Sequence, residues 1–161
     1  MKARILAIFA MMALLVSCGT STSSVDPLLQ KKYVDAATSH NMVIDIISIQ
    51  PVKGNTQYPR GACFFTLKDG KIDGRLPFFG DAFNSLFSGE DVSYVFDNSP
   101  IENLKENFTK ADKGRYYLYF DAPTIGNEKA SFVLCITKTG KVDITVKCTS
   151  RSLMGYTGMI R

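Results

Sequence analysis

The chain has 161 residues, of which 45% are hydrophobic and 21% are charged, and its 19 basic residues exceed its 15 acidic ones by only four. So small an excess, without a cluster of lysines and arginines, gives no support to nucleic-acid binding, and no nucleic-acid partner is expected. The length is enough for one domain with its own core and too short for two domains of ordinary size.

The first residues are typical of a secretory leader. Lys2 and Arg4 precede an uncharged apolar run from Ile5 to Val16, and small residues follow it. Twelve helical residues span about 18 Å, whereas the hydrocarbon of a bilayer is roughly 30 Å thick. The run is therefore too short to cross a membrane, and residues 1–17 are predicted to be a signal peptide.

The end of this leader differs from an ordinary cleavage site, because Leu15, Val16 and Ser17 lead directly into Cys18. That order resembles the lipobox of bacterial lipoproteins, in which the cysteine is joined to diacylglycerol and begins the mature chain. Only a thiol supplies the required nucleophile. We therefore expect a lipid anchor at Cys18. The alternative is an incidental or buried cysteine after a plain signal peptide.

Residues 18–26 are predicted to be a flexible tether, since they lack side chains that could pack. No acidic run follows Cys18, so we expect attachment to the outer membrane on its periplasmic side. Removal of the leader leaves 144 residues with 17 basic and 15 acidic side chains. Residues 27–161 are expected to form a single β-rich domain.

Three further cysteines, Cys63, Cys135 and Cys148, lie in a compartment that permits disulfides. Cys148 falls about five residues beyond the expected hairpin partner of Cys135, some 16 Å along the strand. A bond between these two is excluded, because bridged α-carbons lie within about 7 Å of each other. A bridge from Cys63 to one of them and three small buried thiols are the two alternatives, and we favour the buried thiols.

One short helix is expected at the start of the domain. Asp26 is suited to cap it, Pro27 to its first turn, and Leu29 and Tyr33 recur at helical spacing over about ten residues. The pattern then changes, and residues 42–50 are rich in β-branched side chains and predict a strand.

Two hairpins can be aligned from their turns. Asp69-Gly70 predicts a two-residue loop that places Leu67 opposite Ile72. A three-residue loop at residues 138–140 keeps one apolar face intact, whereas a two-residue loop would mix the faces. The preferred register pairs Phe132, Leu134 and Ile136 with Val146, Ile144 and Val142.

Further strands are expected at residues 91–96 and 115–120, with a weaker one at 104–110 and a last one at 153–161. The total is eight or nine short strands and one helix. Short antiparallel strands at regular spacing favour a closed barrel or a sandwich, so the fold is predicted to be mainly β.

Three stretches carry a family resemblance: LPFFGDAFNS at residues 76–85, RYYLYFDAP at 115–123 and VDITVKCTSRSLMGYTGMI at 142–160. Together they resemble the domain-of-unknown-function family DUF4251 of Bacteroides-type lipoproteins, over nearly the whole mature chain. The resemblance implies a small antiparallel barrel of lipocalin-like topology and no established activity.

The residues that usually perform catalysis are scarce. The single histidine, His40, is expected in a solvated loop after the helix. The spacings of cysteine and histidine match no metal-site pattern, and no motif for a phosphate or a cofactor is present, so neither a metal nor a cofactor is expected. Asp69, Asp73 and Asp81 lie near one another in the sequence, which could indicate a carboxylate pair or a calcium loop. Turn chemistry is the better explanation, because two of them fall directly before glycines. We expect no enzymatic activity.

Aromatic side chains are plentiful, with eleven phenylalanines and seven tyrosines. Several of them, together with charged residues, could line the mouth of a barrel and hold a ligand with apolar and polar parts. The candidates are Arg75, Phe78, Phe79, Asp81, Arg151 and Tyr156. The alternative is that the aromatics simply fill a small barrel, because barrels of about eight strands can be packed solid.

The leading interpretation is an envelope lipoprotein that acts as a non-catalytic binding module for a small amphipathic ligand or an envelope component. The alternative is an interaction or inhibitor domain with a solid interior, which binds a protein partner through a strand edge or exposed aromatics. A cavity behind Phe78 and Phe79 would favour the first, and a filled interior with an open apolar patch the second.

Overall fold

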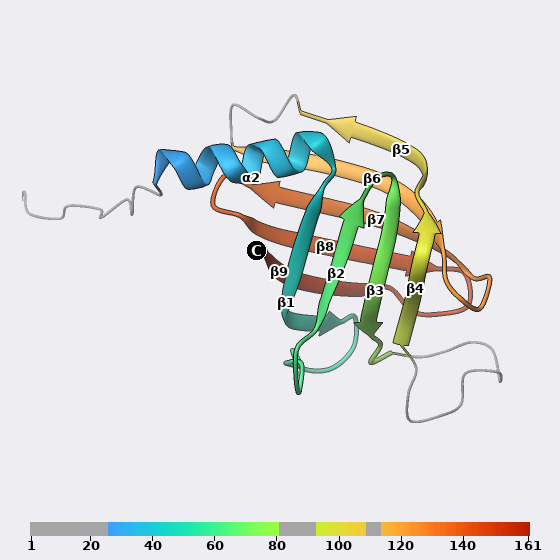
Figure 1. The fold of residues 1–161 in the computed structure, drawn as a ribbon. Helices are drawn as coiled ribbons and strands as arrows, with labels where there is room; N and C mark the ends of the chain where they lie inside the picture. Colours follow the sequence, from blue (N-terminus) through green and yellow to red (C-terminus); the bar gives the residue numbers. More distant parts are fainter. Residues whose placement is uncertain (1–25, 81–92, 109–113) are drawn as a thin grey trace, which may run out of the picture.

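The structure is a computed structural model that describes residues 26–80, 93–108 and 114–161. Within these residues the chain forms one helix and nine strands of a single antiparallel sheet (Figure 1). The elements are α2 (Pro27–Ser39), β1 (Met42–Pro51), β2 (Phe64–Lys68), β3 (Lys71–Pro77), β4 (Ser93–Pro100), β5 (Glu102–Asn107), β6 (Arg115–Pro123), β7 (Lys129–Thr137), β8 (Lys141–Cys148) and β9 (Met154–Ile160).

The strands form an up-and-down barrel that is nearly closed. Their order in the sheet is β4-β3-β2-β1-β9-β8-β7-β6-β5, so every strand pairs with its neighbour in sequence except β4 and β5. The first and last strands pair with each other. The two edges of the sheet are therefore consecutive in the chain, and the predicted mainly-β barrel fold is confirmed.

The seam between β4 and β5 is where the chain leaves one edge of the sheet and joins the other. Asn98 and Asn103 adopt positive φ angles of 47° and 53° there, which asparagine tolerates better than most residues. Near the seam, the amide of Ile125 donates to the carbonyl oxygen of Val95 at 2.9 Å. This bond ties the edge strand β4 to the turn that follows β6.

The helix α2 covers one end of the barrel, which we call the helix end. Asp26 caps it as predicted, because its Oδ1 accepts the amide of Leu28 at 2.9 Å, and its 13 residues exceed the ten expected. Ala37 is fully buried against the barrel. Gly140 has a φ of 80°, and a side-chain carbon there would lie 2.7 Å from the Tyr33 ring. Only glycine fits this contact without strain.

Both predicted hairpin registers are confirmed, since Leu67 lies opposite Ile72 and Phe132 opposite Val146. Cys135 faces Asp143, five residues before Cys148, so those two cysteines cannot be bridged. All three cysteines of the described residues are free thiols.

The other strands differ slightly from the expected ranges. β5 begins at Glu102 rather than near Leu104, and residues 91–92 of the expected fourth strand lie outside the described part. β5 is a short, charged edge strand, which disfavours pairing with another chain. Among residues 26–80, 93–108 and 114–161, no helix has both the length and the apolarity needed to cross a membrane.

Aromatic and aliphatic side chains occupy the interior. The ring of Phe132 lies at its centre, with ring centroids 4.8 Å from Phe120, 5.4 Å from Phe96 and 6.4 Å from Phe65. Two cavities formed by the described residues, a larger and a smaller one, open outside the barrel wall, while a continuous cluster of buried apolar side chains lies inside it. The interior arrangement therefore agrees with the alternative in which aromatics fill the barrel.

Candidate functional site

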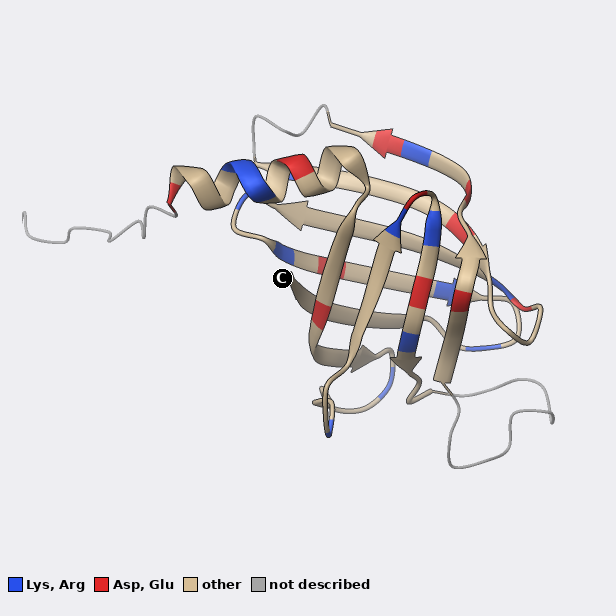
Figure 2. Cartoon of the chain, viewed as in Figure 1, with Lys and Arg blue, Asp and Glu red and all other residues tan. Residues whose placement is uncertain are grey.

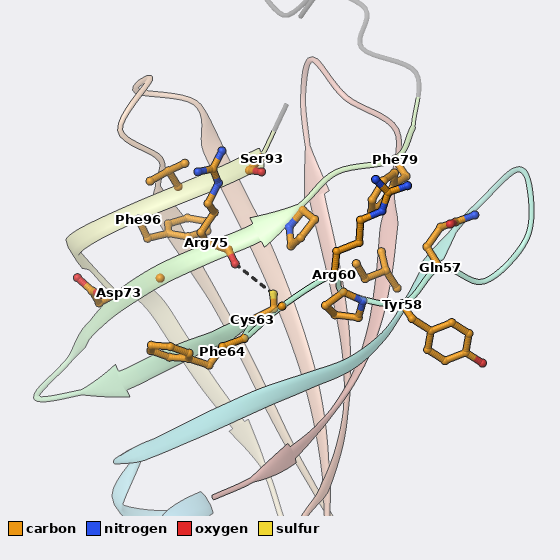
Figure 3. A pocket seen from close by; sticks show the side chains of 17 residues that line it. Gln57, Tyr58, Arg60, Cys63, Phe64, Asp73, Arg75, Phe79, Ser93 and Phe96 are labelled. Carbon is orange, nitrogen blue, oxygen red and sulfur yellow. Dashed lines mark hydrogen bonds between the residues drawn. The ribbon is translucent and has the colours of Figure 1, made fainter. Parts of the chain in front are cut away.

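The larger cavity is a groove of about 960 Å³ on the outside of the barrel, at the end opposite the helix (Figure 3). It lies where β2 begins and β3 ends. β1 and β3 continue past the short strand β2, so the wall is interrupted at this place. We call it the wall groove.

One side of the wall groove is the segment between β1 and β2. Gln57 and Ile49 exchange two backbone hydrogen bonds of 2.8 and 2.9 Å, and the amide of Ile46 donates to Cys63 at 2.8 Å. From Ile46 to Ile49 the chain advances three residues, while the paired segment from Gln57 to Cys63 advances six. The extra residues cannot fit in the sheet, so they loop outward and form the wall.

The floor is the outer face of β3 and β4. Side chains of a strand alternate between its two faces, so Asp73 and Arg75 point outward while Ile72 and Leu76 are buried. The prediction of Asp73 as a turn residue is therefore wrong, since it lies within β3 and pairs with Thr66. Gly74 lets β3 approach β2 closely, because a side-chain carbon there would lie 2.8 Å from the carbonyl oxygen of Phe64. The strand pattern thus places both charged and apolar groups on the floor.

Most of the lining is apolar, with a few charged groups on the floor and on the wall. Exposed aromatic rings come from Tyr58, Phe64 and Phe79, and the cations from Arg60 and Arg75. The carboxylate is that of Asp73, which accepts the amide of Asn98 at 3.3 Å. Large apolar surface beside a few polar groups is the usual composition of a ligand site.

A half-buried thiol, that of Cys63, also lines the wall groove. Its Sγ donates to the carbonyl oxygen of Arg75 at 3.5 Å. Burial raises the pKa of the Cys63 thiol. It therefore stays protonated near neutral pH and lacks the thiolate character of a reactive cysteine.

The residues selected from the sequence divide into two groups rather than forming one rim. Arg75 and Phe79 line the wall groove. Phe78, Arg151 and Tyr156 are buried inside the barrel. The two remaining positions, Cys18 and Asp81, lie outside the described residues.

The inner group surrounds a buried ion pair. The side chains of Arg151 and Glu128 are 4% and 9% exposed, and Nε of the arginine lies 2.9 Å from Oε2 of the glutamate. The guanidinium carbon of Arg151 lies 4.8 Å from the ring centroid of Tyr94 and 5.5 Å from that of Phe78. Ser150 donates a further hydrogen bond to the Glu128 carboxylate. The pair joins the turn after β6, the segment before β9 and the start of β4.

A family model described as a domain of unknown function (DUF4251) matches residues 28–160. The chain belongs to this family. A solved structure of a DUF4251 family protein from Bacteroides eggerthii is similar to it, with a TM-score of 0.60 and 18% identity over 84% of this chain and 88% of that one. At this identity the likeness supports the fold alone. No curated protein matches this chain.

The buried hydroxyls and thiol of the DUF4251 barrel are kept neutral. Burial, with a smaller effect of Glu128, raises the pKa of Cys148 to about 12, and burial raises the pKa of Tyr94 as well. Burial also raises the pKa of Tyr156, whose hydroxyl donates to the carbonyl oxygen of Pro77 at 2.8 Å. This cluster connects strands and offers no charged nucleophile.

Groups that bind metals do not gather in the part of the DUF4251 domain that the structure describes. No three histidine, cysteine, aspartate or glutamate side chains there lie close enough to hold a metal ion. His40 is more buried than its expected loop position suggests, and its Nε2 lies 3.0 Å from Oε1 of Glu106 at the helix end. Cys63 lies at the opposite end, in the wall groove.

Sequence reasoning missed the outer wall residues Tyr58, Arg60, Cys63 and Phe64. One signal was present: Phe64 precedes Phe65 in an alternating strand, so one of the two rings had to face outward. The outward loop had only a weak signal, a run that contains Gly54, Pro59 and Gly61.

Proposed function

We propose that this DUF4251 protein is a lipid-anchored, non-catalytic binding module of the cell envelope, and that its wall groove takes a small amphipathic ligand with an anionic group. The observation that carries the proposal is the groove itself. It offers aromatic and cationic side chains on the outside of a barrel whose interior is occupied.

The chemistry of the lining favours this class of ligand. Phe64 and Phe79 present exposed rings that can cover an apolar part of a ligand. The guanidinium of Arg60 suits a planar or tetrahedral anion, because it offers several donors in a fixed geometry. Asp73 adds a negative charge on the floor and disfavours a second anionic group nearby.

The non-catalytic part of the proposal has a chemical basis as well. Within the described residues, the thiol in the groove is kept protonated by burial, and the chain's single histidine, His40, lies at the other end of the barrel. General acid–base or nucleophilic catalysis needs such groups together and near their useful pKa.

Binding can be tested with anilinonaphthalene sulfonate, a probe with apolar rings and one anionic group, on the folded mature protein. Phe79→Ser and Arg60→Gln should each weaken probe binding by about tenfold. Tyr119→Ser and Arg115→Gln are matched controls, since both are exposed residues of β6 outside the groove. Equal probe affinity in all four variants would refute the proposed site.

The thiol of Cys63 offers a second measurement. A ligand in the groove should slow the alkylation of Cys63, while the half-buried Cys135 on β7 should react at an unchanged rate. Mass spectrometry of the digested protein assigns each rate to its cysteine. Protection of both thiols, or of neither, speaks against occupancy of the groove.

Anchoring at Cys18 is proposed from the lipobox, with the protein on the periplasmic side of the outer membrane. The wild type should incorporate labelled palmitate and sediment with membranes, and Cys18→Ala should do neither. Unlabelled wild type, together with a variant that stays in the membrane fraction, would contradict the anchor.

The second candidate function is the interaction domain, which a filled interior with an open apolar surface was expected to favour over the ligand module. A barrel that is filled leaves its outside for contact, so the wall groove can instead hold an extended segment of a partner protein. Native mass spectrometry of the protein released from membranes separates the two. A bound mass of lipid or metabolite size supports the ligand, and a polypeptide mass supports the partner protein.

A further inference from the structure

The first turn of α2 exposes apolar side chains that the domain does not use. Leu28 is 77% exposed and Leu29 is 44% exposed. Only the later part of the helix packs on the barrel, where Ala37 is buried and Tyr33 contacts the core. The beginning of the helix, in blue, projects beyond the sheet (Figure 1). The beginning of the helix therefore exposes two large apolar side chains to solvent.

Basic side chains accompany these leucines. Lys31 and Lys32 follow on the same helix and are exposed. Lys68 lies at the same end of the barrel, because Leu67 before it pairs with Met42 at the start of β1. Lys138 lies in the turn between β7 and β8, two residues before Gly140, which approaches the Tyr33 ring of the helix. Figure 2 shows basic segments in blue, together with acidic ones in red, on the helix and at this end of the sheet. Apolar side chains next to lysines are typical of segments that lie at a lipid surface. The apolar side chains enter the membrane interface, and the lysine ammonium groups contact the lipid headgroups.

The chain outside the described residues limits where this turn can be. Nine residues, from Cys18 to Asp26, separate the proposed acyl anchor from the helix. At most about 3.5 Å per residue, they reach roughly 30 Å. The first turn of α2 is therefore the part of the described domain nearest to the anchor along the chain, and it lies within about 30 Å of the bilayer whenever Cys18 carries lipid. This step rests on the anchoring proposed above.

The wall groove lies at the other end of the barrel. β1 begins at Met42 beside the helix and reaches the groove at Ile49. Seven residues of strand at about 3.3 Å each place these ends roughly 23 Å apart. A bilayer at the helix end would leave the groove open to the aqueous compartment.

We propose that the first turn of α2, through Leu28 and Leu29, lies on an anionic lipid surface with Lys31 and Lys32 against the headgroups. This contact orients the barrel on its anchor and holds the wall groove away from the bilayer. The partner is the membrane itself, selected by its apolar interface and its negative charge.

The chain contains no tryptophan, so a single introduced one reports its own surroundings. The acylated mature protein carrying Leu28→Trp is reconstituted in vesicles of phosphatidylglycerol and phosphatidylethanolamine whose acyl chains are brominated. Bromine quenches tryptophan only at short range, so emission should fall at least about twofold relative to unbrominated vesicles. Tyr58→Trp, at the wall groove, is the matched control and should not be quenched.

Charge is tested with Lys31→Glu and Lys32→Glu together in the Leu28→Trp protein. Quenching should decrease in the anionic vesicles and change little in phosphatidylcholine vesicles, where the headgroups carry no net charge. An effect of the same size in both kinds of vesicle would overturn the role given to the lysines.

Sedimentation separates the failure of this inference from the failure of the anchor. Protein that sediments with the vesicles without quenching at position 28, or with equal quenching at positions 28 and 58, disproves the proposed orientation and leaves the anchor intact. Protein that does not sediment disproves the anchor, and the orientation with it.

Discussion

Both faces of the barrel wall carry phenylalanine side chains, which are buried on the inner face and exposed on the outer face. Phe65 is fully buried beside the central ring of Phe132, while its neighbour Phe64 lies in the wall groove. The same contrast separates Phe78, 8% exposed, from Phe79, 48% exposed. Neighbouring phenylalanines thus divide between packing and open surface, and strand alternation decides which does which.

This contrast teaches that side chains on the inner face stabilise the fold, whereas those on the outer face stay accessible to solvent. Inner side chains contact many neighbours, so their loss leaves cavities. Outer side chains keep part of their surface in water, so their loss costs little. Substitutions on the two faces should therefore separate stability from binding.

The largest expected effect is at the centre of the inner face. Phe132→Ala removes the ring that contacts Phe65, Phe96 and Phe120, and should lower the free energy of unfolding by about 4 kcal/mol. Urea unfolding followed by circular dichroism measures it. Tyr119→Ala, on the outer face of β6, is the control. An equally large loss of unfolding free energy in that variant would contradict the difference between the two faces.

The buried ion pair should give the next largest effect. Arg151→Met leaves the Glu128 carboxylate buried without its cation and should cost about 3 kcal/mol. The double variant Arg151→Met, Glu128→Leu removes both charges and should recover most of that loss. The single variant Glu128→Leu completes the comparison. If the double variant loses as much free energy of unfolding as the two single variants together, the ion pair is not the source of the effect.

A smaller effect depends on pH at the outer face of β6. The bond from Lys129, 2.8 Å from Oδ2, and then that from Ser131 lower the pKa of Asp121 to about 2. A folded pKa below the unfolded one contributes stability above about pH 4 that is lost as the pH falls toward 2. Lys129 is exposed, so the contribution should stay below about 1 kcal/mol.

Unfolding measured between pH 7 and pH 2 tests this titration. Asp121→Asn should flatten the decline between about pH 4 and pH 2, and Ser131→Ala should flatten it partly because one of the donors is lost. An unchanged decline in the Asp121→Asn variant assigns the acid sensitivity to other carboxyls.

Much of the fold could be predicted because hairpins are local. The Asp69-Gly70 turn and the alternation around residues 138–140 set their own registers, and both are found. The same alternation, continued from Ile72 through Leu76, places Phe78 inside and Phe79 outside. The prediction that both rings line one barrel mouth was wrong, because consecutive residues of an extended segment face opposite sides of the wall.

Other parts of the site depend on contacts that no short stretch contains. Arg151 is buried because Glu128, on a distant turn, meets it, and neither residue lies in a periodic pattern. The outward loop from Gln57 to Cys63 results from a mismatch in the number of residues paired with β1. Composition predicted neither, since both follow from how the barrel closes.

The smallest change in stability is expected at Phe79, where the comparison is sharpest. Phe79→Ser removes a half-exposed ring, so the free energy of unfolding should stay within about 0.5 kcal/mol of the wild type while probe binding weakens. Phe78→Ser, one residue earlier, removes a buried ring beneath Arg151 and should cost about 3 kcal/mol. Urea unfolding and probe titration of the two variants give both quantities. Because the residues are adjacent and identical, a difference between them can only come from the face of the wall that each occupies.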